Sequence, residues 1–242
     1  MIDPELVRNV ELLCLDAGNT VIFLDHDRLA EIIREATGLV IDPRVLIDAE
    51  GEAKRRAESG ALHDLEWEFR ALPGAAPWGK MVGTIALVGG VAPERLPSLL
   101  ARAWRIHEKR NLWCKVPEGL GRALDDARAR GVKVAIISNS EGMLDALFRD
   151  LGIRDHFDLV VDSALVGVEK PDPRIFGFAL EHFRVEPGRA LHLGDFYATD
   201  ILGARAAGIR CALIDPFGHY AGRHSDVPRV PGVVEVAQAV VS

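Results

Sequence analysis

The sequence predicts an α/β fold in which a doubly wound parallel sheet carries an inserted block of helices. Apolar runs of four to six residues, typical of buried strands, alternate in the C-terminal half with segments whose apolar residues recur at helical spacing. Residues 25–113, in contrast, hold helical patterns alone. The alternation favours a Rossmann-like sheet with helices on both faces, and the uninterrupted helical stretch favours an α-helical cap.

The first strand is expected at Leu12–Leu15, an apolar run that ends on Asp16 and a turn of small residues. A second apolar run, Val21–Leu24, is interpreted as a small hairpin or flap beside this strand. Ligands bind at the carboxyl ends of the strands in open α/β sheets, so Asp16 is placed where chemistry is usually done.

The inserted block is expected to consist of helices with a small core of their own. The helical patterns lie at residues 29–36, 43–54, 65–70, 81–88 and 93–111. The four tryptophans of the chain lie in this block, and we interpret them as packing residues. The predicted domains are therefore a catalytic core formed by residues 1–24 and 114–242, and a helical cap formed by residues 25–113.

The rest of the chain returns to alternating patterns. Strands are expected at residues 132–137, 157–161, 190–193 and 211–214. Helices are expected at residues 117–130, 144–151, 173–183, 199–207 and 233–241. This order of elements is what a doubly wound sheet requires.

Composition excludes several classes of protein. The 242 residues are 48% hydrophobic and 27% charged with a net charge of −7, which speaks against the basic face of a nucleic-acid binder. No signal-peptide pattern opens the chain, and no apolar run approaches the ~18 residues that span a bilayer. The three cysteines are far apart, without a zinc-type Cys/His cluster, and are expected to be reduced. We expect a cytoplasmic protein that binds neither nucleic acid nor membranes.

Acidic residues follow two of the predicted strands. Asp16 ends the first strand, Asp195 follows the strand at 190–193, and Asp200 lies just beyond. An acid pair at a helix N-terminus is common without any ligand. Carboxylates that converge on one sheet edge repel each other unless a cation lies between them, which favours a hard ion such as Mg²⁺.

Donor groups are expected at the same edge. Ser138 and Asn139 follow the strand at 132–137, and Lys170 lies in a loop that should return there. A hydroxyl, an amide and an ammonium group suit an anion such as phosphate. Together with the carboxylates they indicate a phosphoryl-transfer site in which Asp16 attacks phosphorus and forms an aspartyl-phosphate.

Four segments in this order resemble the motifs of the haloacid dehalogenase-like (HAD) hydrolase superfamily. They are residues 16–20, 137–139, 167–173 and 193–200. Each motif alone is weak, but their order and separations are similar to those of the branch with a helical cap between the first strand and the core. The resemblance covers the whole chain and implies a Mg²⁺-dependent phosphatase that acts on small phosphorylated metabolites.

The resemblance also implies roles for individual residues. Asp16 would be the nucleophile and a Mg²⁺ ligand, with the main-chain carbonyl of Gly18 and the carboxylate of Asp195 as further ligands. The remaining roles concern phosphate binding and support of the site. Ser138 and Asn139 would bind the phosphoryl group, Lys170 would balance charge between nucleophile and substrate, Asp200 would hold Lys170 or a metal-bound water, and Thr20 would complete the first motif.

One position departs from the phosphatase pattern. Phosphatases of this superfamily usually carry a second Asp two residues after the nucleophile, as general acid and base, but this chain has Gly18. Asn19 stands where a glycine is usual, and Asn tolerates the left-handed backbone expected there. General acid–base catalysis contributes about 10²–10⁴-fold, so we expect weak or leaving-group-selective activity unless Asp25 or His26 takes over the role.

The residue at position 18 leaves three other functions open. Dehalogenases of the superfamily also lack an acid there, but they generally lack the acid at the position of Asp195. Phosphonate-cleaving members have a small residue there and a cap lysine that forms a Schiff base, for which Lys54 is a conceivable counterpart. The third is a non-catalytic regulatory protein that keeps the phosphate pocket. The sequence predicts neither the substrate nor the oligomeric state.

Overall fold

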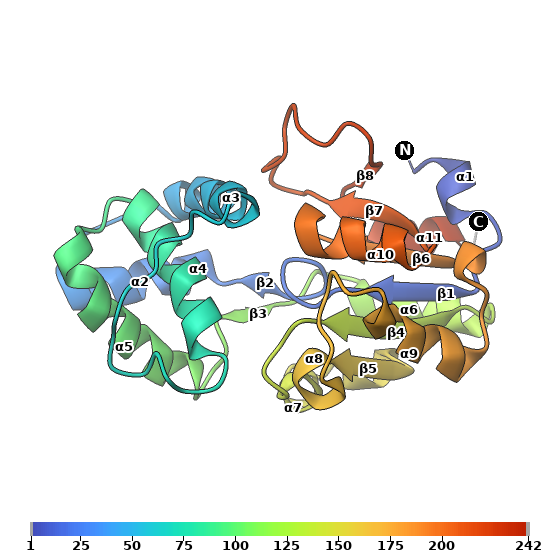
Figure 1. The fold of residues 1–242 in the computed structure, drawn as a ribbon, viewed down its shortest axis with the longest axis horizontal. Coiled ribbons are helices and arrows are strands. Elements are labelled where there is room, and N and C mark those ends of the chain that lie inside the picture. Colours follow the sequence, from blue (N-terminus) through green and yellow to red (C-terminus); the bar gives the residue numbers. More distant parts are fainter. Residues whose placement is uncertain (1, 241–242) are drawn as a thin grey trace. The chain divides into compact units, whose positions relative to one another are not determined.

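The computed structural model describes residues 2–240, and these form two compact units. The α/β unit contains the chain up to Phe23, Lys115–Pro216 and the residues from Gly222 onward. The helical unit contains Leu24–Cys114 and the short segment Phe217–Ala221. Figure 1 shows both strands and helices in the first unit, whereas the second consists mainly of helices.

The α/β unit is built on a six-stranded parallel sheet with the strand order β5-β4-β1-β6-β7-β8. Its strands are β1 (Leu12–Leu15), β4 (Lys133–Ser138), β5 (Leu159–Asp162), β6 (Ala190–Gly194), β7 (Arg210–Ile214) and β8 (Arg229–Val230). The predicted fold class is thus confirmed. Of these strands, β8 was not predicted, because two residues are too short to give a pattern.

Helices cover both faces of this sheet. They are α1 (Pro4–Val7), α6 (Leu120–Ala129), α7 (Leu144–Asp150), α8 (Ser163–Val166), α9 (Arg174–Phe183), α10 (Leu202–Ala206) and α11 (Val233–Val240). Helices α6 and α11 pack together on one face, and α9 and α10 lie on the other (Figure 1). Burial on both faces explains why β1 is apolar throughout. The last helix was predicted to reach Val241, which lies outside the described residues.

The order of the strands determines where a ligand would bind. From β1 the chain adds β4 and β5 on one side, and then crosses to β6, β7 and β8 on the other. Leu15 in β1 is therefore in register with Ile136 of β4 and with Leu193 of β6. The carboxyl ends of β1 and β6 form the topological switch point at which open α/β sheets bind their ligands.

The helical unit is the insert that follows β1. Its helices are α2 (His26–Thr37), α3 (Pro43–Glu58), α4 (Ala75–Val88) and α5 (Leu96–His107), with a short 3₁₀ turn, η1 (Pro93–Arg95). Asp25 caps α2 by accepting the N–H of Arg28, and Gly38 ends it with a left-handed φ of 78°. The unit has its own apolar core, to which Trp67, Trp78 and Trp104 belong.

Two local predictions were wrong. The expected helix at 65–70 is a pair of turns, in which Arg70 N–H bonds to Trp67 O and Leu72 N–H to Phe69 O. The turns place the Trp67 ring against other aromatic rings of the unit, and this packing outweighs weak helical propensity. The run at 21–24 does not form a hairpin. Its residues Phe23–Leu24 (β2) pair with Trp113–Lys115 (β3), at the opposite end of the insert.

The cysteines Cys14, Cys114 and Cys211 are all free; Cys14 and Cys211, in strands of the six-stranded sheet, are buried, and Cys114 in β3 is partly exposed. Burial raises the pKa of the Cys14 thiol to about 12, which leaves it protonated and inert. Between residues 2 and 240, no helix combines the length and the apolar character needed to cross a membrane.

Candidate active site

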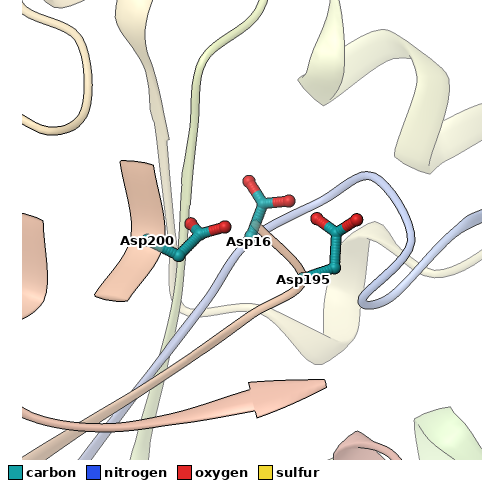
Figure 2. Close-up of side chains that lie close together, drawn as sticks. All are labelled: Asp16, Asp195 and Asp200. Carbon is teal, nitrogen blue, oxygen red and sulfur yellow. The ribbon is translucent and has the colours of Figure 1, made fainter. Parts of the chain in front are cut away.

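Three buried carboxylates meet at the switch point of the sheet. Asp16 follows β1, Asp195 follows β6, and Asp200 lies in the single π-helical turn at Tyr197–Ile201 (η4). Each offers an oxygen within 4.8 Å of the others, a group that could hold a metal ion (Figure 2). The main-chain N–H of Asp16 bonds to Leu193 O at 2.9 Å, which ties the end of β1 to β6.

Lys170 joins two of these acids. Its Nζ lies 2.6 Å from Asp16 Oδ1 and 2.6 Å from Asp200 Oδ1, and its side chain is only 2% exposed. A buried ammonium group is stable only when it is paired in this way. One lysine among three carboxylates leaves the cluster with an excess of negative charge, which a bound cation would offset.

The acids differ in how easily they ionise. Burial raises the pKa of Asp16 to about 6; Lys170 opposes the rise, and Asp200 and Asp195 add to it. Burial acts in the same sense on Asp200, but Lys170 and the ring of His192 outweigh it and hold the pKa of Asp200 below its usual range. Burial disfavours the Lys170 cation, yet Asp16 and Asp200 together raise the pKa of its ammonium group. Asp200 and Lys170 are therefore charged. The excess of negative charge in the cluster makes Asp16 the acid that is hardest to ionise.

Asn139 holds the main chain of Lys170. Its Nδ2 donates to Lys170 O at 2.9 Å, and its Oδ1 accepts the N–H of Lys170 at 2.7 Å. The side chain thus uses its carbonyl oxygen and one of its two N–H groups on Lys170, which leaves its second N–H and the main-chain N–H of Asn139 as groups that could bind phosphate. Ser138, the last residue of β4, is buried at the same edge of the sheet.

The turn after Asp16 has the backbone expected from the sequence. Asn19 has a left-handed φ of 52°, as the sequence analysis expected for this position. Its N–H bonds to Ile22 O at 2.6 Å, and Gly18 forms a bridge with the same residue. Thr20 is buried, and its hydroxyl has no hydrogen-bond partner within residues 2–240.

The residues suggested as substitute acids lie in the helical unit, where each has a partner. Asp25 Oδ1 accepts the N–H of Arg28 at 3.0 Å as the cap of α2. His26 Nε2 lies 2.9 Å from Glu50 Oε2, and both side chains are buried. Lys54 is also buried, one helical turn beyond Glu50, and its charge helps to lower the pKa of Glu50 against the opposing effect of burial.

His192 was missed by the sequence analysis. It lies in the middle of β6, is fully buried, and places its Nε2 3.0 Å from Asp200 Oδ1. The main-chain N–H of Phe196 donates to the other oxygen, Oδ2, at 3.0 Å. A signal was available, since a single histidine in an otherwise apolar strand needs a polar partner when it is buried.

The fold and the site together define a class of protein with a parallel α/β sheet, a helical insert after its first strand and a carboxylate–lysine site at the switch point. The chain belongs to the haloacid dehalogenase-like hydrolase family, whose sequence profile matches residues 10–208.

Relatives of known name support this assignment. The human haloacid dehalogenase-like hydrolase domain-containing protein 3 is 32% identical over 209 residues, which are 85% of this chain and 82% of that protein. The mouse protein of the same name is 44% identical over 100 residues, and this match spans only 40% of its length. A phosphoserine phosphatase from Thermus thermophilus is 38% identical over 145 residues, 58% of this chain and 56% of that protein.

Solved structures agree on the fold. The HAD-hydrolase YfnB from Bacillus subtilis, bound to magnesium, superposes with a TM-score of 0.64 and 16% identity over 96% of this chain and 99% of that one. The shared architecture is the parallel sheet with helices α2–α5 inserted after β1.

Proposed function

We propose that this protein is a Mg²⁺-dependent phosphatase that hydrolyses small phosphate monoesters through an aspartyl-phosphate at Asp16. The observation that carries the proposal is the pair of 2.6 Å contacts from Lys170 Nζ to Asp16 and Asp200. They hold one oxygen of Asp16 beside a permanent cation at the carboxyl end of a central strand. A phosphate monoester is a dianion, and this cation would bind it next to the nucleophile.

The first chemical step is a displacement at phosphorus. Within residues 2–240, Asp16 Oδ1 accepts a hydrogen bond from Lys170, and no such bond reaches Oδ2. A carboxylate oxygen of Asp16 forms the new O–P bond as the ester O–P bond breaks, and the alkoxide leaves with the electron pair and takes a proton from water. Water then cleaves the acyl phosphate, which returns the Asp16 carboxylate and releases inorganic phosphate.

The donor set fits Mg²⁺. All candidate ligands are oxygens, which Mg²⁺ prefers, and three carboxylates gather around one lysine. Asp200 accepts hydrogen bonds from Lys170, His192 and Phe196, and we propose that Asp16, Asp195 and the Gly18 carbonyl would hold the ion. When bound, the ion would neutralise charge that develops on the phosphoryl oxygens.

Names of relatives support a small phosphorylated substrate. The phosphoserine phosphatase from Thermus thermophilus matches 58% of this chain, and phosphoserine is a small phosphate monoester. Ser138 and the main chain of Asn139 are proposed to hold the phosphoryl oxygens, and Thr20 to support the turn around Asp16.

Gly18, two residues after Asp16, stands where an acid could protonate the leaving group. We therefore propose that turnover is slow with substrates whose leaving group needs a proton.

A panel of substrates tests the proposal. The purified protein is assayed with alkyl and aryl phosphates, with a 2-haloacid and with a phosphonoaldehyde, each with and without Mg²⁺. We expect Mg²⁺-dependent release of phosphate from esters, and its loss in Asp16→Asn. Metal-independent release of halide would indicate a dehalogenase instead. Cleavage of the phosphonate that Lys54→Ala abolishes would indicate a phosphonate-cleaving enzyme instead. Binding of phosphate without turnover of any substrate would indicate a regulatory protein.

A further inference from the structure

His192 is a polar residue in the most buried part of the sheet. It stands on β6 with apolar neighbours in sequence, Leu191 and Leu193, and none of the three has measurable exposure. The Phe176 ring and its imidazole pack in a T-shaped arrangement, with 5.0 Å between the ring centroids. Its polar contact is the 3.0 Å bond from Nε2 to Asp200 Oδ1.

The surroundings of His192 determine where its proton lies. The other ring nitrogen, Nδ1, is buried and has no hydrogen-bond partner among residues 2–240. A proton on Nδ1 would bury a donor with nothing to accept it, which costs more than leaving the acceptor unused on a neutral ring. The proton therefore sits on Nε2, and a neutral imidazole donates it to Asp200.

With this hydrogen bond from His192, three donors hold the carboxylate of Asp200. Oδ1 receives both Lys170 and His192, and Oδ2 receives the N–H of Phe196. Bonds at both oxygens prevent the carboxylate from rotating. Lys170 has three N–H groups, of which one points to Asp200 and one to Asp16, so the direction of the third is determined as well.

We propose that His192 is a positioning residue that holds Asp200, and through it Lys170, in the orientation that serves Asp16. The proposal rests on the proposed phosphatase function and adds a residue that touches neither substrate nor nucleophile. It also explains why the strand keeps a histidine with one unused nitrogen, where an apolar residue would bury no unpartnered group.

Two substitutions at this position separate positioning from packing. His192→Leu removes the donor, and His192→Gln keeps an N–H at a similar reach. Phe176→Leu is the matched control, because it loosens the packing of the same ring and leaves the hydrogen bond in place. Each variant is assayed for kcat and KM with an aryl phosphate and Mg²⁺, and its melting temperature is measured without Mg²⁺.

We expect activity and stability to separate. In His192→Leu, kcat should fall about 10-fold or more with KM little changed, because a hydrogen bond to a charged group is lost, while the melting temperature should fall no further than in Phe176→Leu. His192→Gln should recover most of kcat, and Phe176→Leu should lose stability but not kcat. Full activity in His192→Leu, or losses of activity that follow stability across all three variants, would overturn the proposal.

A measurement without substrate keeps this test independent of the proposed function. Nitrogen NMR of the histidine rings should show His192 as the neutral Nε2–H form, with a slowly exchanging proton that shifts in Asp200→Asn. A charged ring or an Nδ1–H form would overturn the positioning role even if the enzyme is active. If no ester is turned over, the proposed function fails, and the NMR result alone decides whether His192 holds Asp200.

Discussion

Gly194 and Asp200 lie so close together that a side chain at Gly194 has no room. A Cβ atom added to Gly194 would stand 2.5 Å from the Cβ of Asp200, and closer still to its carboxyl carbon. Gly194 ends β6, whereas Asp200 lies in the π-helical turn that follows. The missing side chain on the strand is therefore what allows the turn to bring Asp200 back over β6 to Lys170.

Gly194→Ala should inactivate the enzyme. The added methyl group must displace Asp200, and a catalytic arrangement that shifts by about 1 Å loses about 100-fold in rate. The measurement is kcat/KM with an aryl phosphate. Gly188→Ala is the control, because a Cβ there would meet nothing within 4 Å. Equal activity in the two variants would show that the position of Asp200 does not matter for turnover.

Asn139→Ala should weaken activity through Lys170. It removes two hydrogen bonds to the Lys170 main chain, which are worth about 1 kcal/mol each, so we expect kcat to fall about 10-fold and thermal stability to decrease. Asn111→Ala is a suitable control, because that side chain bonds to the nearby N–H of Trp113 in the helical unit. An unchanged kcat in Asn139→Ala would show that catalysis does not depend on how Asn139 holds the Lys170 main chain.

Asp16 and Asp200 should affect stability with opposite dependence on pH. Burial raises the pKa of Asp16 to about 6, so the folded metal-free protein binds this proton more tightly than the unfolded chain does. Its unfavourable effect on stability grows from about pH 4 to pH 6 and is constant above that range. Asp16→Asn should therefore melt higher than the wild type at pH 7 and no higher at pH 4.

Asp200 is the matched comparison from the same cluster. Burial disfavours its charge, but Lys170 and His192 outweigh burial and hold the pKa of Asp200 below its usual range. Its contribution to stability is present above the pKa of an unfolded Asp, about 3.9, and is lost as the pH falls further. Asp200→Asn should therefore melt lower than the wild type at pH 7, and the same sign for both variants would contradict the assigned charges.

Gly18→Asp should raise turnover. The new carboxyl group could protonate a leaving group, a contribution of about 10²-fold or more, which should be larger for an alkyl phosphate than for an aryl phosphate. The backbone accepts the change, since Gly18 does not have a left-handed φ. Gly18→Asn controls for size without a transferable proton. Unchanged rates with both esters would mean that another group already transfers the proton.

Sequence patterns were sufficient for five of the six strands of the sheet, β8 being the exception, and for most of the helices. Buried parallel strands are apolar along their whole length, so the runs that became β1, β4, β6 and β7 stood out and were predicted to within about two residues. Sequence patterns were insufficient where the conformation of a segment depends on contacts with residues far away in the chain. The turns around Trp67 depend on aromatic rings from α4 and α5, and β2 pairs with a strand ninety residues later, between positions 23 and 113.

Residue type and order alone were enough to predict the family, the acids at the ends of β1 and β6, and the lack of an acid at Gly18. Which of these groups are in contact depends on the folded domain. In the folded protein, Lys170 donates to Asp200, and the Asn139 amide donates to the main chain of Lys170. His192, inside the sheet, forms a hydrogen bond with Asp200. Hydrogen bonds act over about 3 Å, and contacts at that range between residues distant in sequence follow from the packing of the whole domain.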